Sequence, residues 1–212
     1  MSLSEMRADH RRRTLIEADV TNEPFAQFRL WFDEAIHASV PDANAMTLAT
    51  ATRNGEVSAR IVLLKSFDER GFCFFTNYES KKGKTLAENP HAALVFYWQP
   101  LDRQVRIEGT VTVMSAEESD EYFRSRPADS QIGALASPQS QTIPNREFLE
   151  SRFKQLEKQH NNNIIPRPAS WGGYRLAPTV VEFWQGRPSR LHDRLVYRKL
   201  ADGSWKITRL AP

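Results

Sequence analysis

The stretch SRPADSQIGA, residues 125–134, and the turn of chain before it hold polar side chains that suit anion binding. Tyr122 and Arg126 are four residues apart, so on a helix they share one face. Pro127 ends such a helix, because the residue before a proline is disfavoured in the helical conformation. Ser130 then stands at the start of the next turn. A phenol, a guanidinium and a hydroxyl that converge would bind a phosphate, although a solvated helix end explains the same residues.

Two further groups of cations precede this stretch. In RIVLLK, Arg60 and Lys65 are five residues apart, so on one strand they point to opposite faces. They could serve two anions, serve one ligand and one surface, or be ordinary charges at a strand end. In TNYESKKGK, Ser80, Lys81 and Lys82 lie where a helix starts. Cations there oppose the helix dipole, and an anionic ligand would remove the conflict; a solvated basic face is the alternative.

A fourth group lies in EFWQGRPSRLHDR, residues 182–194, near the C-terminus. Arg190, His192 and Arg194 alternate, so on a strand all three face the same side. That arrangement is costly unless the face meets an anion or a ring. Trp184 is either a core residue or a wall for a flat cofactor. No residues suggest a Ser-His-Asp triad, a pair of catalytic carboxylates or a metal site. We therefore expect a cofactor to carry the chemistry.

Composition limits the class of protein. The chain has 212 residues and a formal net charge of +3, from 29 Lys and Arg against 26 Asp and Glu. This mild excess suits an anionic small ligand better than nucleic acid. The single cysteine, Cys73, excludes a disulfide within the chain and predicts a buried, reduced thiol. No segment has the roughly 20 apolar residues that span a bilayer, so the expected compartment is the cytoplasm.

The hydrophobic pattern predicts elements that must position these residues. A helix begins near Pro24, with Asn22 as its cap, and its apolar face includes Phe25, Phe28, Trp31, Phe32, Ala35 and Ile36. Residues 45–53 and 56–67 read as strands joined by an Asn54-Gly55 turn, and further strands cover 71–77, 92–100 and 103–114. Helices are expected over 80–90, 115–125 and 145–159. The C-terminal third is β again, with separate strands at 174–178, 179–186, 194–200 and 204–210.

These elements make eight or nine strands, mostly antiparallel because their connections are short, with four or five helices. A mainly β (α+β) fold, an antiparallel barrel with flanking helices, is the natural architecture. Residues 1–20 are expected to form a mobile N-terminal arm, and residues 21–212 a single domain. The sequence has no G-x-G-x-x-G motif and no run of βαβ units, so dinucleotide-binding and P-loop folds are disfavoured.

Several of these motifs, in their order along the chain, resemble those of the pyridoxamine/pyridoxine 5'-phosphate oxidases. They are RIVLLK, SRPADSQIGA, PQSQ, VEFWQG, RLHDR and the terminal WKITRLAP, and the resemblance runs from about Pro24 to Pro212. It implies an FMN-binding split β-barrel that works as a homodimer with two active sites at the subunit interface. It also implies oxidation of pyridoxamine or pyridoxine 5'-phosphate to pyridoxal 5'-phosphate, with O2 as electron acceptor and H2O2 as product.

The resemblance also implies roles for individual residues. The substrate's phosphate would contact Lys65, Tyr122, Arg126 and Ser130, and Arg190 and His192 would be the catalytic pair on the pyridine ring. In the N-terminal arm, Arg7 and His10 would cover the substrate; His10 stands where the family usually has Tyr, and Lys81 where Arg is common. The flavin contacts would be Arg60, Ile61, Val62, Leu63, Leu64, Lys65, Phe75, Thr76, Lys81, Lys82, Gln104, Gln139, Ser140, Trp184 and Arg194.

Three alternatives remain at this point. A phenazine-biosynthesis-type flavin oxidase of the same barrel acts on larger aromatic substrates and needs no phosphate site. A non-catalytic protein that binds flavin or pyridoxal phosphate would produce no peroxide. A weak nucleic-acid binder is suggested by the high isoelectric point and by HRRR, but the sequence has no basic-aromatic motif of the RNA-binding type.

Overall fold

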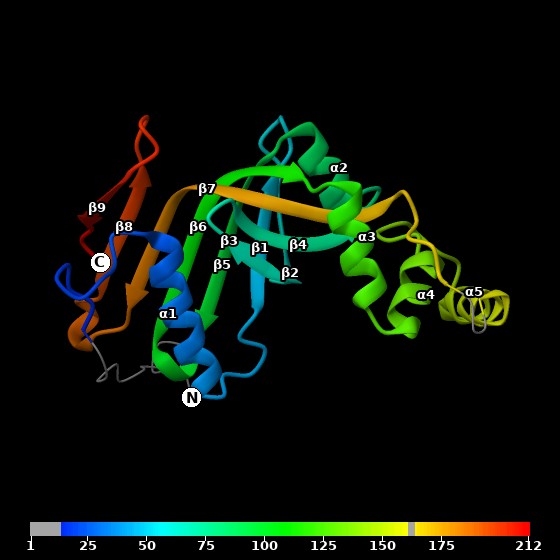
Figure 1. Cartoon of the computed structure of the whole chain (residues 1–212), viewed down its shortest axis with the longest axis horizontal. Coiled ribbons are helices and arrows are strands. Elements are labelled where there is room, and N and C mark those ends of the chain that lie inside the picture. The colour runs from blue at the N-terminus through cyan, green and yellow to red at the C-terminus, as the bar shows by residue number, and fades with distance from the viewer. Residues whose placement is uncertain (1–13, 161–163) are drawn as a thin grey trace.

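The structure is a computed structural model that describes residues 14–160 and 164–212. Arg7 and His10 lie outside these described residues. In the described part, nine strands form one antiparallel sheet, and five α-helices flank it, as the sequence predicts (Figure 1). The strands are β1 (Ala45–Ala51), β2 (Val57–Leu63), β3 (Ser66–Asp68), β4 (Gly71–Asn77), β5 (His91–Trp98), β6 (Arg103–Val113), β7 (Trp171–Gln185), β8 (Asp193–Lys199) and β9 (Trp205–Arg209).

The strand order is β2-β1-β5-β6-β7-β4-β3, and β8 joins β7 to β9. β7 is the long central strand. One of its edges pairs with β6, while the other pairs first with β4 and then with β8. This division of one edge between two partners splits the barrel. Figure 1 shows β7 reaching from the side of α3 to the side of β8.

The prediction of two separate strands over residues 174–186 is wrong, because β7 is continuous through Pro178. The register with β6 shifts between Glu108 and Gly109, so a bulge accommodates the proline. On the other edge, Pro178 lies between the last pair with β4 and the first pair with β8, where the missing N–H breaks no ladder. Gly109 is required here, because a Cβ would lie 2.1 Å from the carbonyl oxygen of Ala177.

Helix α1 (Pro24–His37) closes one side of the barrel. Phe28 is fully buried, and its ring packs on Phe72 and Phe96 of the sheet. The predicted cap and part of the predicted face are wrong: Glu23 is the N-cap residue and forms no side-chain cap, and Ile36 is 54% exposed. The helix is held by its aromatic face and not by its start.

The other helices are α2 (Lys81–Glu88), α3 (Ala116–Ser125), α4 (Ala128–Ala136) and α5 (Arg146–Gln159). The last three gather at one end of the molecule, opposite β8 and β9 (Figure 1). They enclose a second, smaller core of Phe123, Ile132, Ile165 and Trp171. The predicted capping box of Ser115 and Glu118 opens α3. In the predicted arm, Leu15 is buried, and its N–H donates to Asp193.

Candidate active site

A cleft of about 560 Å³ opens where β2 and β4 meet α2 and the α3–α4 junction. It collects predicted site residues from three separate groups of the sequence. Ser125 and Pro127, which were not predicted, also border it, and both belong to the SRPADSQIGA stretch. The full lining is Arg60, Ile61, Val62, Leu63, Lys65, Phe75, Thr76, Lys82, Tyr122, Ser125, Arg126, Pro127, Ser130 and Gln139.

Arg60 and Lys65 line the same cleft, so their expected separation onto opposite strand faces is wrong. The reason is that β2 ends at Leu63, and the two residues are not on one continuous strand. Leu64, beyond the strand end, is buried in the core at 5% exposure and does not line the cleft. Its backbone N–H donates to the carbonyl oxygen of Asn44.

Arg126 caps the C-terminus of α3 in an extended conformation, as Pro127 requires. Its Nη1 atom is buried and has no hydrogen-bond partner among the described residues. Burial lowers the pKa of the guanidinium, since the charged form is poorly solvated. Among those residues no carboxylate forms an ion pair with it. Arg126 as a whole is half-buried, but a buried guanidinium nitrogen without an acceptor is costly, so a ligand anion is the partner that this geometry accommodates.

Three more polar groups line the same cleft as Arg126. Tyr122 stands one turn earlier on α3, and its ring stacks on Phe75 with centroids 3.9 Å apart. Ser130 lies in the first turn of α4, a helix start whose N–H groups favour negative charge. Lys65 faces the same cleft. The structure therefore brings the four predicted phosphate contacts to one place.

A second cationic group occupies the other part of the cleft. The Nζ atom of Lys82 donates to Thr76 Oγ1 at 3.0 Å and to Gln139 Oε1 at 2.9 Å. Burial lowers the pKa of Lys82, and the nearby charge of Arg60 lowers it further. Ser80 caps α2 by accepting from the N–H of Gly83, so Lys82 lies in the first turn of that helix. Two cations and a helix start with no neutralising carboxylate among the described residues make a second anion site.

Two predicted flavin contacts are placed less favourably for binding a ligand at this second anion site. Lys81 is exposed at the start of α2 and does not border the cleft. Ser140 is also exposed and has a positive φ of 70°. The Oε1 atom of its neighbour Gln139 accepts a hydrogen bond from Thr76 Oγ1 at 2.9 Å.

The remaining predicted residues form a separate cluster near the far end of β7. Gln104, Trp184 and Arg194 lie side by side on β6, β7 and β8, in one row of the ladder. Arg194 is already held by two hydrogen bonds to the buried Glu182, which raise its pKa, and by the carbonyl of Ala211. Trp184 is half-buried, and its ring lies against that of His192 with centroids 4.6 Å apart.

The prediction that Arg190, His192 and Arg194 share one strand face is wrong. β8 begins at Asp193, and Arg190 lies in a 3-10 turn, Pro188–Arg190, with a φ of 60°. His192 follows that turn, and its Nδ1 accepts the N–H of Arg187 at 3.0 Å. Because Nδ1 is an acceptor, the neutral ring carries its proton on Nε2. The backbone geometry of this turn, and not strand alternation, therefore determines the directions of the two predicted catalytic side chains.

The Arg126 cleft and the Trp184 cluster are far apart within one chain. Trp171 packs beneath Arg126 at the first residue of β7, and Trp184 lies thirteen residues later on the same strand. At about 3.3 Å per residue, the path between them is roughly 40 Å. Figure 1 shows the two ends of β7 on opposite sides of the molecule. One chain therefore cannot close both groups around a single small ligand.

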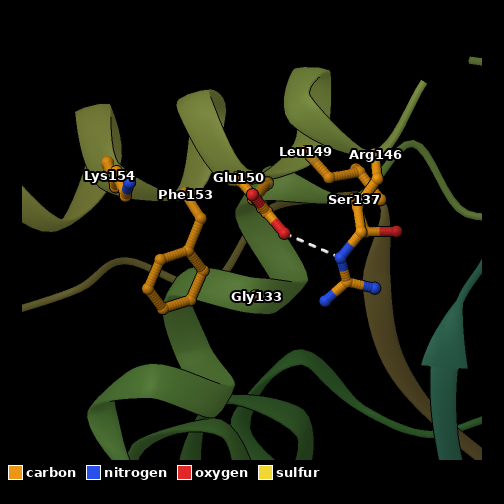
Figure 2. Close-up of a pocket in the computed structure, with 8 residues that line it drawn as sticks. Gly133, Ser137, Arg146, Leu149, Glu150, Phe153 and Lys154 are labelled. Atoms are coloured by element: carbon orange, nitrogen blue, oxygen red, sulfur yellow. Dashed lines mark hydrogen bonds and ion pairs between the residues drawn. The ribbon is translucent and has the colours of Figure 1, made fainter. Parts of the chain in front are cut away.

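A different groove, of about 400 Å³, lies between α4 and α5 and is lined by Leu149 and Phe153 (Figure 2). Arg146 on its rim is paired with Glu150, Nε to Oε1, at 2.7 Å. None of the predicted site residues lies in this groove. Its lining includes the carboxylate of Glu150 beside the cations Arg146 and Lys154, whereas the described residues that line the Arg126 cleft include no carboxylate.

Other kinds of chemistry find little support in the described ranges. Across residues 14–160 and 164–212, no three His, Cys, Asp or Glu side chains gather as a metal would require. Cys73 is buried, and burial raises the pKa of its thiol, which disfavours a nucleophilic thiolate. Within the same ranges, every helix falls short of the length and apolar content needed to cross a bilayer.

Comparison with known proteins identifies the class first. A solved structure of PhzG from Burkholderia lata, in complex with tetrahydrophenazine-1-carboxylic acid, superposes with a TM-score of 0.89 at 33% identity, covering 94% of this chain and 98% of that one. An FMN-binding, pyridoxamine 5'-phosphate oxidase-related protein from Nostoc punctiforme has the same fold, with a TM-score of 0.74 at 18% identity, covering 91% of this chain and all of that one. The fold is thus the split β-barrel of these proteins.

Sequence comparison then identifies the family. Residues 32–160 match the family model described as pyridoxamine 5'-phosphate oxidase, and residues 171–212 match the pyridoxine 5'-phosphate oxidase C-terminal dimerisation region. Proteins named pyridoxine/pyridoxamine 5'-phosphate oxidase are 57% identical in Cupriavidus pinatubonensis, over 99% of both chains, and 58% identical in Burkholderia mallei, over 100% of this chain and 99% of that one. The chain belongs to the pyridoxine/pyridoxamine 5'-phosphate oxidase family and is an oxidoreductase.

Proposed function

We propose that this protein is an FMN-dependent oxidase that converts pyridoxamine and pyridoxine 5'-phosphates to pyridoxal 5'-phosphate, with O2 as electron acceptor and H2O2 as product. The names of the full-length relatives support this substrate class. One structural observation carries the proposal: Arg126 presents a buried guanidinium nitrogen with no partner among the described residues, in a cleft shared with Lys65, Tyr122 and Ser130. A phosphate ester supplies the anion that this site lacks.

The second anion site fits the phosphate of FMN. Burial lowers the pKa of both Arg60 and Lys82, the charge of Arg60 lowers the pKa of Lys82 further, and the start of α2 adds N–H groups. The two sites border one cleft, so two phosphorylated molecules can be bound next to each other. When bound, the flavin supplies the acceptor for the two electrons that the substrate loses. The contribution of the protein is to position both molecules and to balance their charge.

The remaining residues come, in this proposal, from a second copy of the chain. The description of residues 171–212 as a dimerisation region supports a homodimer. The sheet also exposes large apolar side chains near the cleft: Ile61 is 65% exposed, Leu63 41% and Tyr97 58%. Such a patch is typical of a protein interface. A second copy seated there would bring its own Arg190, His192 and Trp184 to the Arg126 cleft.

Arg190 and His192 then bind the ring end of the substrate, opposite its phosphate. The Nε2 proton of His192 can be donated to an oxygen or nitrogen on the ring, because Nδ1 is occupied by the N–H of Arg187. Arg190 supplies positive charge and directional donors that orient the amine or alcohol at the reacting carbon. With both ends held, the substrate cannot rotate away from its reactive geometry.

Purified protein tests this proposal directly. We expect a yellow protein that bleaches anaerobically when pyridoxamine 5'-phosphate is added, and that releases one H2O2 per turnover in air. Binding of pyridoxal 5'-phosphate without peroxide would show a non-catalytic protein. Turnover of a phenazine precursor such as tetrahydrophenazine-1-carboxylic acid, with none of the B6 phosphates, would assign the chain to the activity suggested by its likeness to PhzG.

A further inference from the structure

We infer that Trp171 is a positioning residue for the phosphate site: its ring orients Arg126 and Tyr122, and so sets the affinity for phosphorylated substrate. The inference rests on the proposed function. Trp171 does not line the cleft; with Arg126 and Ser130 it lines an adjoining cavity of about 290 Å³. It therefore acts through its neighbours.

The contact with Arg126 is face-on. The Cζ atom of Arg126 lies 4.6 Å from the centroid of the Trp171 ring, closer than its 5.7 Å distance to Phe123. Trp is the strongest cation–π partner among side chains, and the attraction grows when the pair is shielded from water. No carboxylate of the described residues pairs with Arg126, and of the two described rings that its guanidinium faces, Trp171 is the nearer. A face contact leaves the N–H edge of the guanidinium available to a phosphate.

The same ring also aligns Tyr122. The Tyr122 and Trp171 rings are nearly parallel, with an interplanar angle of 6° and centroids 6.2 Å apart. Phe75 stacks on both, at 3.9 Å from Tyr122 and 5.6 Å from Trp171. The stack restricts the phenol to one orientation, so its hydroxyl is placed before the ligand arrives.

Trp171 is itself rigidly held, as a positioning residue must be. It is 7% exposed and pairs with Asn77 of β4 across the sheet. Arg167 donates to the Trp171 carbonyl oxygen and forms an ion pair with Asp120 of α3 at 2.6 Å. The helix that carries Tyr122 is thus tied to the strand that carries Trp171.

The test compares Trp171→Leu with Trp171→Phe in the FMN-loaded protein. Calorimetry with pyridoxal 5'-phosphate should show about tenfold weaker binding for the Leu variant and less than about threefold for the Phe variant, which keeps a ring face. The KM for pyridoxamine 5'-phosphate should rise to match, with kcat within about twofold. The affinity for FMN should not change, a selectivity that general loosening of the fold would not produce.

The matched control is Trp205→Leu. Trp205 on β9 also has a cation over its ring, with Lys199 Nζ 5.9 Å from the centroid, but it lies away from the cleft. This variant should bind pyridoxal 5'-phosphate as the wild type does. Equal losses in Trp205→Leu and Trp171→Leu would overturn the inference.

A double-mutant cycle with Arg126→Ala distinguishes the inference from the proposed function. If Trp171 acts through Arg126, Trp171→Leu should weaken binding much less in the Arg126→Ala background than in the wild type. Equal effects in both backgrounds, or normal binding by Trp171→Leu, would refute the inference and leave the proposed function standing. Normal binding by Arg126→Ala would instead refute the proposed phosphate site. If Trp171→Leu does not fold, Trp171→Met, which fills more of the volume, replaces it in the cycle with the same expected outcomes.

Discussion

Trp171 and Trp184 stand at the two ends of a single strand, β7, and each belongs to a different half of the candidate site. Trp171 supports the Arg126 cleft, and Trp184 packs against His192. The strand that joins them also keeps them apart. In the proposed homodimer, a complete site therefore takes two chains, with each chain giving its Trp171 end to one site and its Trp184 end to the other.

Mixed dimers test this arrangement. Arg126→Ala and Arg190→Ala should each be nearly inactive alone, because every site in either homodimer lacks one essential cation. Co-expressed with different affinity tags, the two chains form heterodimers in which one site is fully wild type and the other carries both changes. A random one-to-one mixture should recover about one quarter of the wild-type activity per chain.

The control for the mixed-dimer experiment pairs two changes from the same half of the site. Co-expression of Arg126→Ala with Lys82→Met should not restore activity, because both residues line the cleft of one chain. Recovery in that pair, or no recovery in the Arg126 and Arg190 pair, would contradict a site shared between chains.

Replacement of Arg126 should separate stability from binding. The apo form of Arg126→Met should be at least as stable as the wild type, because a buried guanidinium nitrogen without a hydrogen-bond partner among the described residues is removed. At a pyridoxal 5'-phosphate concentration of 100 times its Kd, the wild type should gain about 2.7 kcal/mol, and the variant far less at the same concentration. Thermal unfolding with and without ligand measures both effects. A large loss of apo stability in the variant would contradict the interpretation.

Lys82 should give the apoprotein a particular pH dependence. Its folded pKa is lowered from 10.5, mainly by burial, so in that range the unfolded chain binds more protons than the folded one. The free energy of unfolding therefore rises as the pH increases toward 10.5, and the cost of the buried charge is fully present below the folded pKa. The difference in unfolding free energy between wild type and Lys82→Met should grow in favour of the wild type between neutral pH and pH 10.

Lys84→Met provides the comparison, since Lys84 is exposed on the same helix. Its difference from the wild type should stay flat over the same pH range, and its FMN affinity should not change. Lys82→Met should lose FMN affinity. A pH-independent difference for Lys82→Met would show that its charge is not the source of the destabilisation.

Much of the fold was predictable because its signals are local. Alternating apolar residues and the Asn54-Gly55 turn predict β1 and β2, and Ser115 with Glu118 predicts the start of α3. The continuity of β7 was not predictable, because Pro178 is read as a strand breaker. Only the sheet shows that the proline coincides with a bulge and with the change of partner from β4 to β8.

The site residues also divide into those that local sequence signals predict and those that only the folded structure brings together. Tyr122, Arg126 and Ser130 are close in sequence, so helix spacing and one proline are enough to group them. Trp171 carries no such signal, because it reaches Arg126 only through the packing of β7 beside β4 and under α3. The turn at Arg190 was missed because alternation suggests a strand, while the positive φ values at Ser189 and Arg190 are set by the loop.

Substitutions of His192 should separate its structural role in the loop from its proposed role in the chemistry. Its Nδ1 accepts the Arg187 N–H, and its Nε2 is the atom proposed to act on substrate. Asn can place an amide oxygen near the Nδ1 position but offers nothing at Nε2. His192→Asn keeps the acceptor for the Arg187 N–H but loses the ring contact with Trp184, so it should melt at a higher temperature than His192→Gln. Its affinity for pyridoxal 5'-phosphate should fall far less than that of Arg126→Ala, because the phosphate site is untouched. Its kcat should fall by about 100-fold, a typical loss for a group that transfers or stabilises a proton.

His192→Gln provides the converse arrangement, with a polar atom near Nε2 and none at Nδ1. We expect it to retain more kcat than His192→Asn but to melt at a lower temperature, because the Arg187 N–H loses its acceptor. Steady-state kinetics and thermal unfolding of both variants separate the two effects. Full turnover in His192→Asn would remove His192 from the chemistry, since the only role left to it would be to hold the loop between β7 and β8.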